Sequence, residues 1–134
     1  MALLRRRHLP PELERAFKSF RLVVALVERA KAVLPEAMPS TRFAGRPLPD
    51  VLMEFESQLG AARRAMPAWR RPEVDEEWIA CSSGISDGLA RAERLRLEAP
   101  DIGGFEGLIG VLGNLLATLE PFEVAASRFD ALRV

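Results

Sequence analysis

The sequence predicts an all-α fold, namely an antiparallel up-down-up-down bundle of four long helices whose last helix is kinked or split near Pro121. Three observations support this prediction. Apolar residues recur at spacings of three and four in four separate segments, as in helices that bury one face. No segment shows the sustained alternation of apolar and polar residues that is typical of a strand. The connections between the segments are short, which favours antiparallel neighbours.

Residues 10–34 form the first predicted helix. Pro10 and Pro11 suit its start, because the first turn of a helix does not use the N–H group that proline lacks. Lys31 is the one polar member of an inner line whose other members are apolar: Leu13, Phe17, Phe20, Val24, Val27 and Leu34. Residues 22–27 (LVVALV) are apolar on all sides, so we expect them to be central in the bundle or covered by a partner.

A loop rich in proline and glycine, residues 35–48, leads to the second predicted helix at 49–66. The inner line of this helix is Leu48, Leu52, Phe55, Leu59, Ala62 and Met66. The third predicted helix covers residues 72–98 and begins with Pro72 and an acidic run, which complements the positive end of the helix dipole. Its inner line is Val74, Trp78, Cys81, Ile85, Ala92 and Leu95.

The fourth predicted helix starts at Ile102, with Asp101 as its N-cap. It has the most regular pattern in the chain, formed by Phe105, Leu108, Leu112, Leu115, Leu119, Phe122, Ala126 and Phe129. Pro121 interrupts this pattern. Because proline cannot continue the hydrogen bonding of a helix interior, we expect a kink or a break near residues 117–120.

The chain of 134 residues is long enough to bury a core of its own. We therefore expect one helical-bundle domain, residues 10–134, after a flexible basic tail, residues 1–9. The basic residues near the N-terminus are followed by proline and acid and not by the apolar run of a signal peptide, which predicts a cytoplasmic protein. Its 17 Arg against 2 Lys indicate a GC-rich, bacterial source.

The composition argues against several function classes. The 19 basic and 19 acidic residues cancel, whereas nucleic-acid binders usually carry a basic excess. Arginines do cluster near residues 5–7, 63–71 and 91–96, and we interpret these clusters as balanced surface charge. With one His, one Cys and no Tyr, we expect no catalytic residue, no metal site and no cofactor.

Two motif matches are interpreted as incidental. Gly84, Ser86 and Gly88 fit the G-x-S-x-G pattern of hydrolases, but that pattern needs a strand-to-helix turn, and here the serine falls in the middle of a helix. Residues 102–119 are long and apolar enough to span a membrane. Five glycines, Asn114 and the lack of flanking basic or aromatic anchors favour a core helix instead, so we do not expect a membrane partner.

The glycines are the most informative feature. The fourth helix contains Gly103, Gly104, Gly107, Gly110 and Gly113. Each interior glycine costs a helix about 1 kcal/mol relative to alanine, so some contact should offset the loss. Antiparallel packing about the turn at 99–101 places Gly88 near Gly110 and Gly84 near Gly113, where small residues let two helices approach closely. Alternatively, these glycines line a ligand or partner groove together with the neighbouring Trp78, Cys81 and Asn114.

Two functions follow as hypotheses. The first is protein–protein association, with a homodimer expected before an unidentified protein partner, because residues 22–27 and the fourth helix offer more apolar surface than four helices need to hide. The alternative is binding of a small apolar ligand in the bundle core, near the glycines of the third and fourth helices. The predicted groove residues are Trp78, Cys81, Gly84, Gly88, Gly110 and Asn114.

Overall fold

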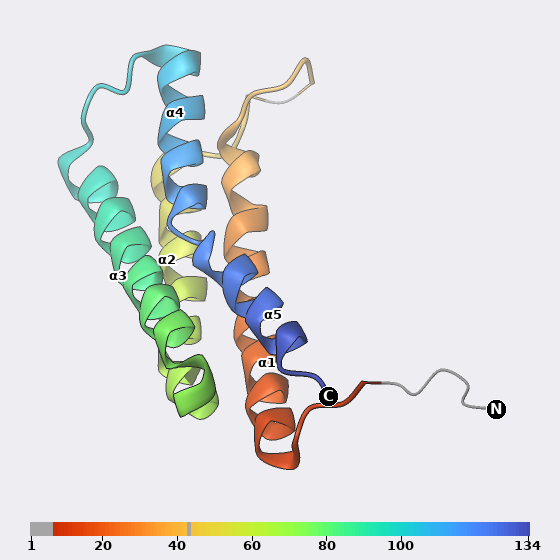
Figure 1. Ribbon diagram of the computed structural model, residues 1–134. Helices are drawn as coiled ribbons and strands as arrows, with labels where there is room; N and C mark the ends of the chain where they lie inside the picture. Colours follow the sequence, from red (N-terminus) through yellow and green to blue (C-terminus); the bar gives the residue numbers. More distant parts are fainter. Residues whose placement is uncertain (1–6, 43) are drawn as a thin grey trace.

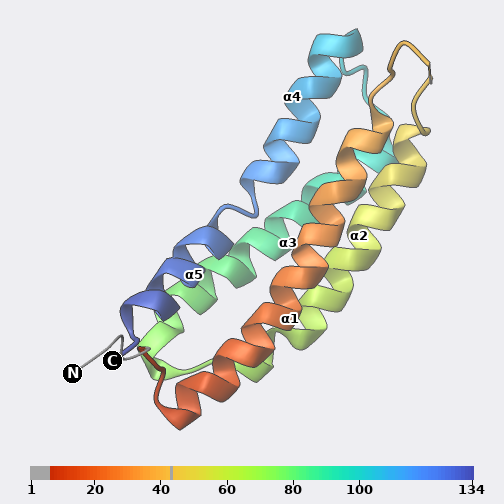
Figure 2. The same ribbon diagram turned by 90° about the vertical axis from the view of Figure 1, so that its right-hand side faces the viewer.

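A computed structural model describes residues 7–42 and 44–134, and this part of the chain contains helices and connecting segments but no strands (Figure 1). The α-helices are α1 (Pro11–Val33), α2 (Leu48–Ala65), α3 (Asp75–Glu98), α4 (Gly104–Ala117) and α5 (Pro121–Ala131). Short 3₁₀ turns lie at Leu34–Ala37, Met66–Trp69 and Pro72–Val74. The elongated, antiparallel arrangement in Figure 2 confirms the predicted all-α bundle.

The last predicted helix is split into α4 and α5, and its path bends by 31°. Pro121 begins α5, where its missing N–H group costs no hydrogen bond. The start of α4 is two residues later than predicted. Asp101 is not the N-cap; its carboxylate accepts a hydrogen bond from the backbone N–H of Gly103 at 3.0 Å. Gly103 and Gly104 adopt φ angles of 79° and 74°, which glycine reaches without the steric cost that other residues incur.

The end of the bundle where α1 begins and α5 ends (Figure 1) is closed by an aromatic cluster. We call it the closed end. Its centre is Phe20, whose ring centroid lies 4.8 Å from that of Trp69 and 5.0 Å from that of Phe129. All three side chains are at most 1% exposed. Phe17 and Phe122 extend the cluster, so α1, α5 and the turn after α2 share one core.

The described part of the predicted tail is held against the C-terminus. The N–H of His8 donates to the carbonyl of Val134 at 2.9 Å, and the N–H of Val134 donates to the carbonyl of His8 at 2.8 Å. Leu9 is buried, and the Arg7 side chain donates to the carbonyl of Arg133. Residues 1–6 of the predicted tail lie outside the described residues.

The opposite end, which we call the open end, is built from α4 and the adjoining ends of α1, α2 and α3. Figure 2 shows α4 running beside α1 and diverging from α3 toward its own N-terminus. Only Leu112 and Leu115 of α4 are buried among its hydrophobic residues. Phe105, on the predicted inner line, is 54% exposed, and the adjacent Ile109 is 49% exposed. The apolar stripe of the last predicted helix is thus covered at Phe122 and Phe129 of α5 and uncovered at the start of α4. Ala126, expected on this stripe, is exposed, and Ala125 is buried in its place.

The buried face of α1 is rotated relative to the prediction. The buried residues of α1 are Leu13, Ala16, Phe20, Val23, Val27, Ala30 and Val33. Phe17 and Val24, expected on the inner line, are only half-buried, because α1 packs chiefly against α2 and α4 does not cover this side. Within residues 22–27, Leu22 is 69% exposed, so the chain alone does not cover this apolar stretch.

Candidate functional site

The predicted glycine pairs between α3 and α4 are wrong in register. Gly84 and Gly88 are buried, but both face Thr118, at the junction of α4 and α5, and not Gly113 and Gly110. A Cβ atom on Gly88 would lie 2.9 Å from the Thr118 hydroxyl and 3.0 Å from Leu59, and one on Gly84 would overlap the Thr118 carbonyl oxygen. The expected pairs rested on a tight turn at 99–101, whereas the connection extends from Ala99 to Gly103, so residues later in the last predicted helix lie opposite the α3 glycines.

Close packing of the helices therefore explains why residues 84 and 88 are glycines. Gly84 and Gly88 let the Thr118 backbone lie against α3, and the Thr118 hydroxyl donates to the Leu115 carbonyl at 2.6 Å. Gly110, by contrast, is exposed and has no neighbouring atom within 4 Å of where a Cβ would stand, and the same holds for Gly113. Their cost to the helix has no offsetting contact within the described residues.

The structure does not bring the six predicted groove residues together. The Trp78 indole N–H donates to the Met66 carbonyl at 2.8 Å, and the Arg70 guanidinium lies 4.2 Å from the centre of the Trp78 ring. Cys81 is fully buried, as the inner line predicted. Burial raises the pKa of the Cys81 thiol to about 12, and the negative charge of Glu77 adds to this shift. This thiol is consequently protonated at neutral pH and is no nucleophile.

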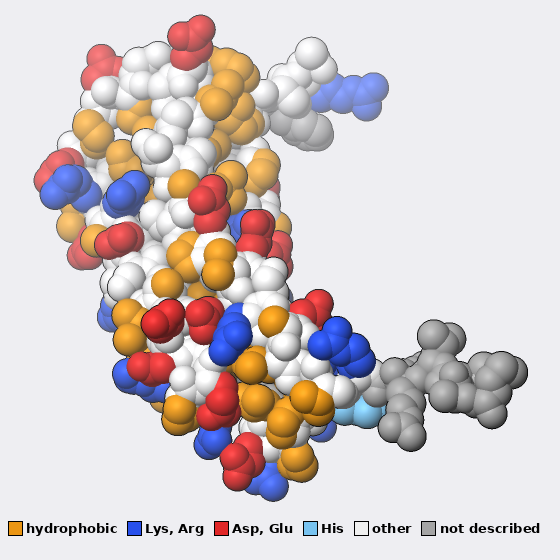
Figure 3. Space-filling view, in the orientation of Figure 1, with side chains coloured by type: hydrophobic (Ala, Val, Ile, Leu, Met, Phe, Trp, Pro, Cys, Tyr) orange, Lys and Arg blue, Asp and Glu red, His pale blue; other side chains and the backbone are white. Residues whose placement is uncertain are grey.

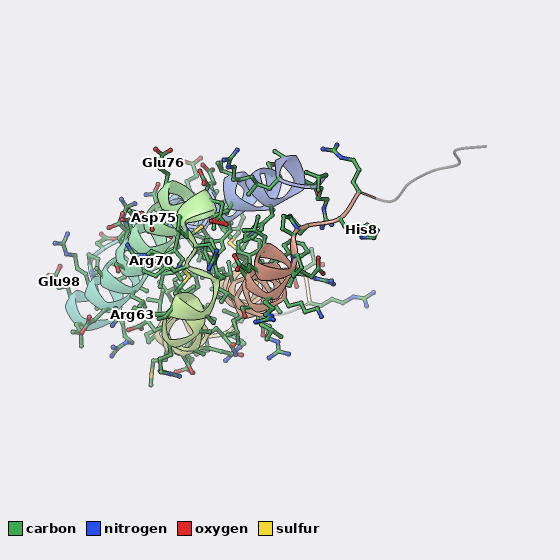
Figure 4. All side chains as sticks on the ribbon, turned by 60° about the horizontal axis from the view of Figure 1, so that its bottom comes forward. His8, Arg63, Arg70, Asp75, Glu76 and Glu98 are labelled. Atoms are coloured by element: carbon green, nitrogen blue, oxygen red, sulfur yellow. The ribbon has the colours of Figure 1, made fainter. Side chains whose placement is uncertain are left out.

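The other candidate motifs find structural explanations. Ser86 lies in the interior of α3, so no strand-to-helix turn presents it as a nucleophile. The cluster at residues 63–71 is dispersed, because Trp69 is buried and Arg70 pairs with Asp75 at 3.1 Å, as Figure 4 shows beside the start of α3. Across the described ranges, no group of three or more His, Cys, Asp or Glu side chains is arranged to hold a metal ion.

An apolar hollow lies where sequence reasoning expected a covered core. This apolar groove, of about 480 Å³, runs between α1 and the α4–α5 junction and includes the half-buried faces of Phe17 and Val24. Its apolar lining is Phe17, Phe20, Val24, Ala25, Leu119, Phe122 and Ala126. Its rim carries both charge signs, from Arg21, Glu28, Lys31 and Glu123. Lys31 and Glu28 are paired at 3.2 Å.

The uncovered side of α4 adjoins this groove at the open end. Phe105 and Ile109 form its apolar surface, and Glu106 is the one charged residue of α4. Figure 3 shows apolar side chains along the edge of α4 at this end of the molecule. Such a gathering of apolar side chains on a surface typically marks a contact with another molecule.

The α4–α5 stretch, residues 104–131, is long and apolar enough in composition to cross a membrane, with a mean hydropathy of 1.4 and 28% of the window buried. Length and composition alone are weak evidence for a span. The break before Pro121 interrupts its helical hydrogen bonding, and α5 carries charges at Glu123, Arg128 and Asp130. Charged side chains and broken backbone hydrogen bonds are both costly in a lipid environment.

A smaller hollow of about 180 Å³ lies on the other side of α4, against α3, and we call it the α3–α4 hollow. It is lined by Arg91, Arg94, Leu95, Val111, Asn114 and Leu115. Asn114 is thus the one predicted groove residue that lines a hollow described here. Comparisons with models of protein families, with curated proteins and with solved structures found no match, so the function is inferred from this chain's own residues.

Proposed function

We propose that this protein acts through protein–protein association and forms a homodimer through α4 and the apolar groove. The uncovered apolar side of α4 is the observation that carries this proposal. Phe105 and Ile109 are about half exposed in the single chain, at 54% and 49%. Removing apolar surface from water contributes about 25 cal/mol per Å², so covering this side of α4 favours association.

The charges favour a second copy as the partner. In a two-fold dimer the same surface patch meets itself, so the patch must be self-complementary. The rim of the apolar groove has two cations and two anions, and α4 carries one charge, so neither surface repels its own copy. Glu106 of one copy then approaches Arg21 or Lys31 at the groove of the other.

The dimensions require both surfaces. A helix of 14 residues is about 21 Å long, so one of its faces alone does not supply the roughly 800 Å² that a stable interface buries on each partner. We infer that α4 of each copy lies in the apolar groove of the other, which covers two helix faces and two grooves at once.

The test is the molar mass of the purified protein by light scattering over a concentration series. Wild-type protein should be dimeric, and Ile109→Glu should be monomeric, because a carboxylate at this half-exposed position opposes burial. Met53→Glu is the matched control, since Met53 is 57% exposed on α2 and lies outside the apolar groove. It should remain dimeric. A monomeric wild type at every concentration would refute the proposal.

A small apolar ligand in the core beside the α3 glycines receives less support. The space next to Gly84 and Gly88 is already filled by Thr118 and Leu59. Gly110 lies on the surface of α4, away from any enclosed volume that these two glycines could share. We therefore keep association as the proposed function.

A further inference from the structure

We propose that the α3–α4 hollow binds a fatty acid, with the carboxylate on Arg91 and Arg94 and the first part of the alkyl tail on the apolar floor. This site is separate from the apolar groove. Leu95 of α3 and Val111 and Leu115 of α4 line the hollow, and none of them lines that groove. The proposal does not depend on dimerisation.

The cationic side of the hollow lacks counter-ions. Arg91 and Arg94 form no ion pair with any described carboxylate, and no acidic residue is among the lining residues. Arg96, two residues further along α3, differs, since its guanidinium binds both carboxylate oxygens of Glu56, at 2.8 and 3.1 Å. Two free guanidinium groups one turn apart suit a carboxylate, which accepts paired N–H bonds from arginine.

Asn114 completes the polar side of the hollow from α4. Its side-chain amide can donate to a carboxylate oxygen, and it lies opposite the two arginines of α3. Donors from two helices thus converge on one small volume. The amide of Asn114 therefore distinguishes this arrangement from a row of arginines along one helix.

The floor of the hollow is apolar and indicates that the ligand has a tail. Leu115 is 1% exposed, and Leu95 and Val111 are half-buried. The volume of about 180 Å³ suits a carboxylate and a few methylene groups. Leu108 is also half-buried, three residues before Val111 on the same side of α4, so the tail can continue toward the N-terminus of the helix.

The same features argue against a free inorganic anion or a nucleic acid. An anion without a tail leaves the leucine and valine floor uncovered, and a polyanion needs a longer cationic track than two arginines. A monocarboxylate with an alkyl chain uses the charge and the floor together.

The sequence provides its own reporter for a test by NMR. The chain has a single Asn, Asn114, and a single Gln, Gln58, so its ¹⁵N-correlated spectrum contains two side-chain amide pairs from these residue types. Gln58 lies on α2 and is not among the lining residues, so it serves as the internal control. Titration with sodium decanoate should shift the Asn114 amide saturably, with a dissociation constant near the millimolar range for a ligand of about 12 heavy atoms. The Gln58 amide should stay in place.

Matched probes and variants separate charge from tail. Acetate and decanol should each bind at least about tenfold more weakly than decanoate, because acetate lacks the alkyl tail and decanol lacks the carboxylate. The double variant Arg91→Ala with Arg94→Ala should lose a similar factor. Arg63→Ala with Arg64→Ala, two exposed arginines of α2 outside the hollow, should match wild type.

The outcomes divide clearly, since both double variants change only exposed side chains and their folding is checked by circular dichroism. Saturable decanoate binding lost only in the α3 variant supports the site. Equal binding by the two double variants overturns it. Equal shifts of Asn114 with acetate or inorganic phosphate overturn the role of the tail, and equal shifts with decanol overturn the role of the arginines.

Discussion

At the closed end, Phe20, Trp69 and Phe129 are stacked into a core that is at most 1% exposed, whereas at the open end Phe105 stays 54% exposed. Phe105 and Phe129 belong to the same apolar stripe, which continues through α4 and α5 at spacings of three and four. Periodicity identifies the apolar side of a helix. Whether that side is covered depends on the path of the chain, and here the break before Pro121 directs only α5 onto the aromatic cluster.

The largest expected effect tests the closed end. Phe129→Ala removes a ring that contacts Phe17, Phe20 and Trp69, so we expect it to lower the free energy of unfolding by about 3–5 kcal/mol. Urea denaturation measures this value. Phe105→Ala is the matched variant at the open end and should change the stability of the monomer by less than about 0.5 kcal/mol. Similar losses in the two variants would show that both ends are equally packed.

The glycines provide the next comparison. Gly84→Ala places a Cβ against the Thr118 carbonyl, so the α4–α5 junction must shift and stability should fall by about 1–3 kcal/mol. Gly110→Ala meets no atom within 4 Å and should raise stability by up to about 1 kcal/mol, because alanine favours the helix. Urea denaturation below the dimer dissociation constant measures both. A loss in both variants would mean that α4 packs more closely than the structure shows.

The smallest effect concerns the buried thiol. The folded pKa of Cys81 is raised from 9.0 to about 12, so the folded state disfavours the thiolate. Stability is therefore unaffected below pH 9 and falls as pH rises from 9 toward 12, with a loss of about 1 kcal/mol at pH 10. Urea denaturation at pH 8 and pH 10 should show this additional loss in wild type and not in Cys81→Ala.

Thiol reactivity sharpens the same comparison. Iodoacetamide at pH 8 should leave native Cys81 unmodified for as long as the protein stays folded, because the thiol is buried and protonated. Adding Ile109→Cys to the Cys81→Ala variant places the thiol at a half-exposed position of α4, where it should react quickly. Equal reaction rates would contradict the contrast between the two ends.

Much of the fold could be predicted from local patterns. The starts and ends of the helices lie within three residues of the predicted ones. The last helix is split, as Pro121 predicted. Cys81 was expected to be buried and is. These features depend on propensity, on proline geometry and on which side of a helix is apolar, all of which are local properties of the sequence.

The candidate site could be predicted only in part, because it depends on the relative placement of helices. The register of Gly84 and Gly88 depends on the length of the connection before α4, and a tight turn at 99–101 leads to the wrong partners. Phe17 and Val24 were assigned to the core because periodicity does not reveal that a groove separates this side of α1 from the α4–α5 junction. Two features of the sequence did indicate where α4 begins and ends. They are the adjacent glycines Gly103 and Gly104 before it and the proline Pro121 after it.

The contact of Thr118 with Gly84 and Gly88 has a mechanical consequence. At Gly84 the backbone of the junction lies directly against α3, so Thr118 is the point from which α4 extends. α4 has 14 residues and is about 21 Å long, so a rotation of about 10° about Thr118 would move its Gly104 end by about 4 Å. A small shift at either buried glycine would therefore change the width of the open end, a full helix length away.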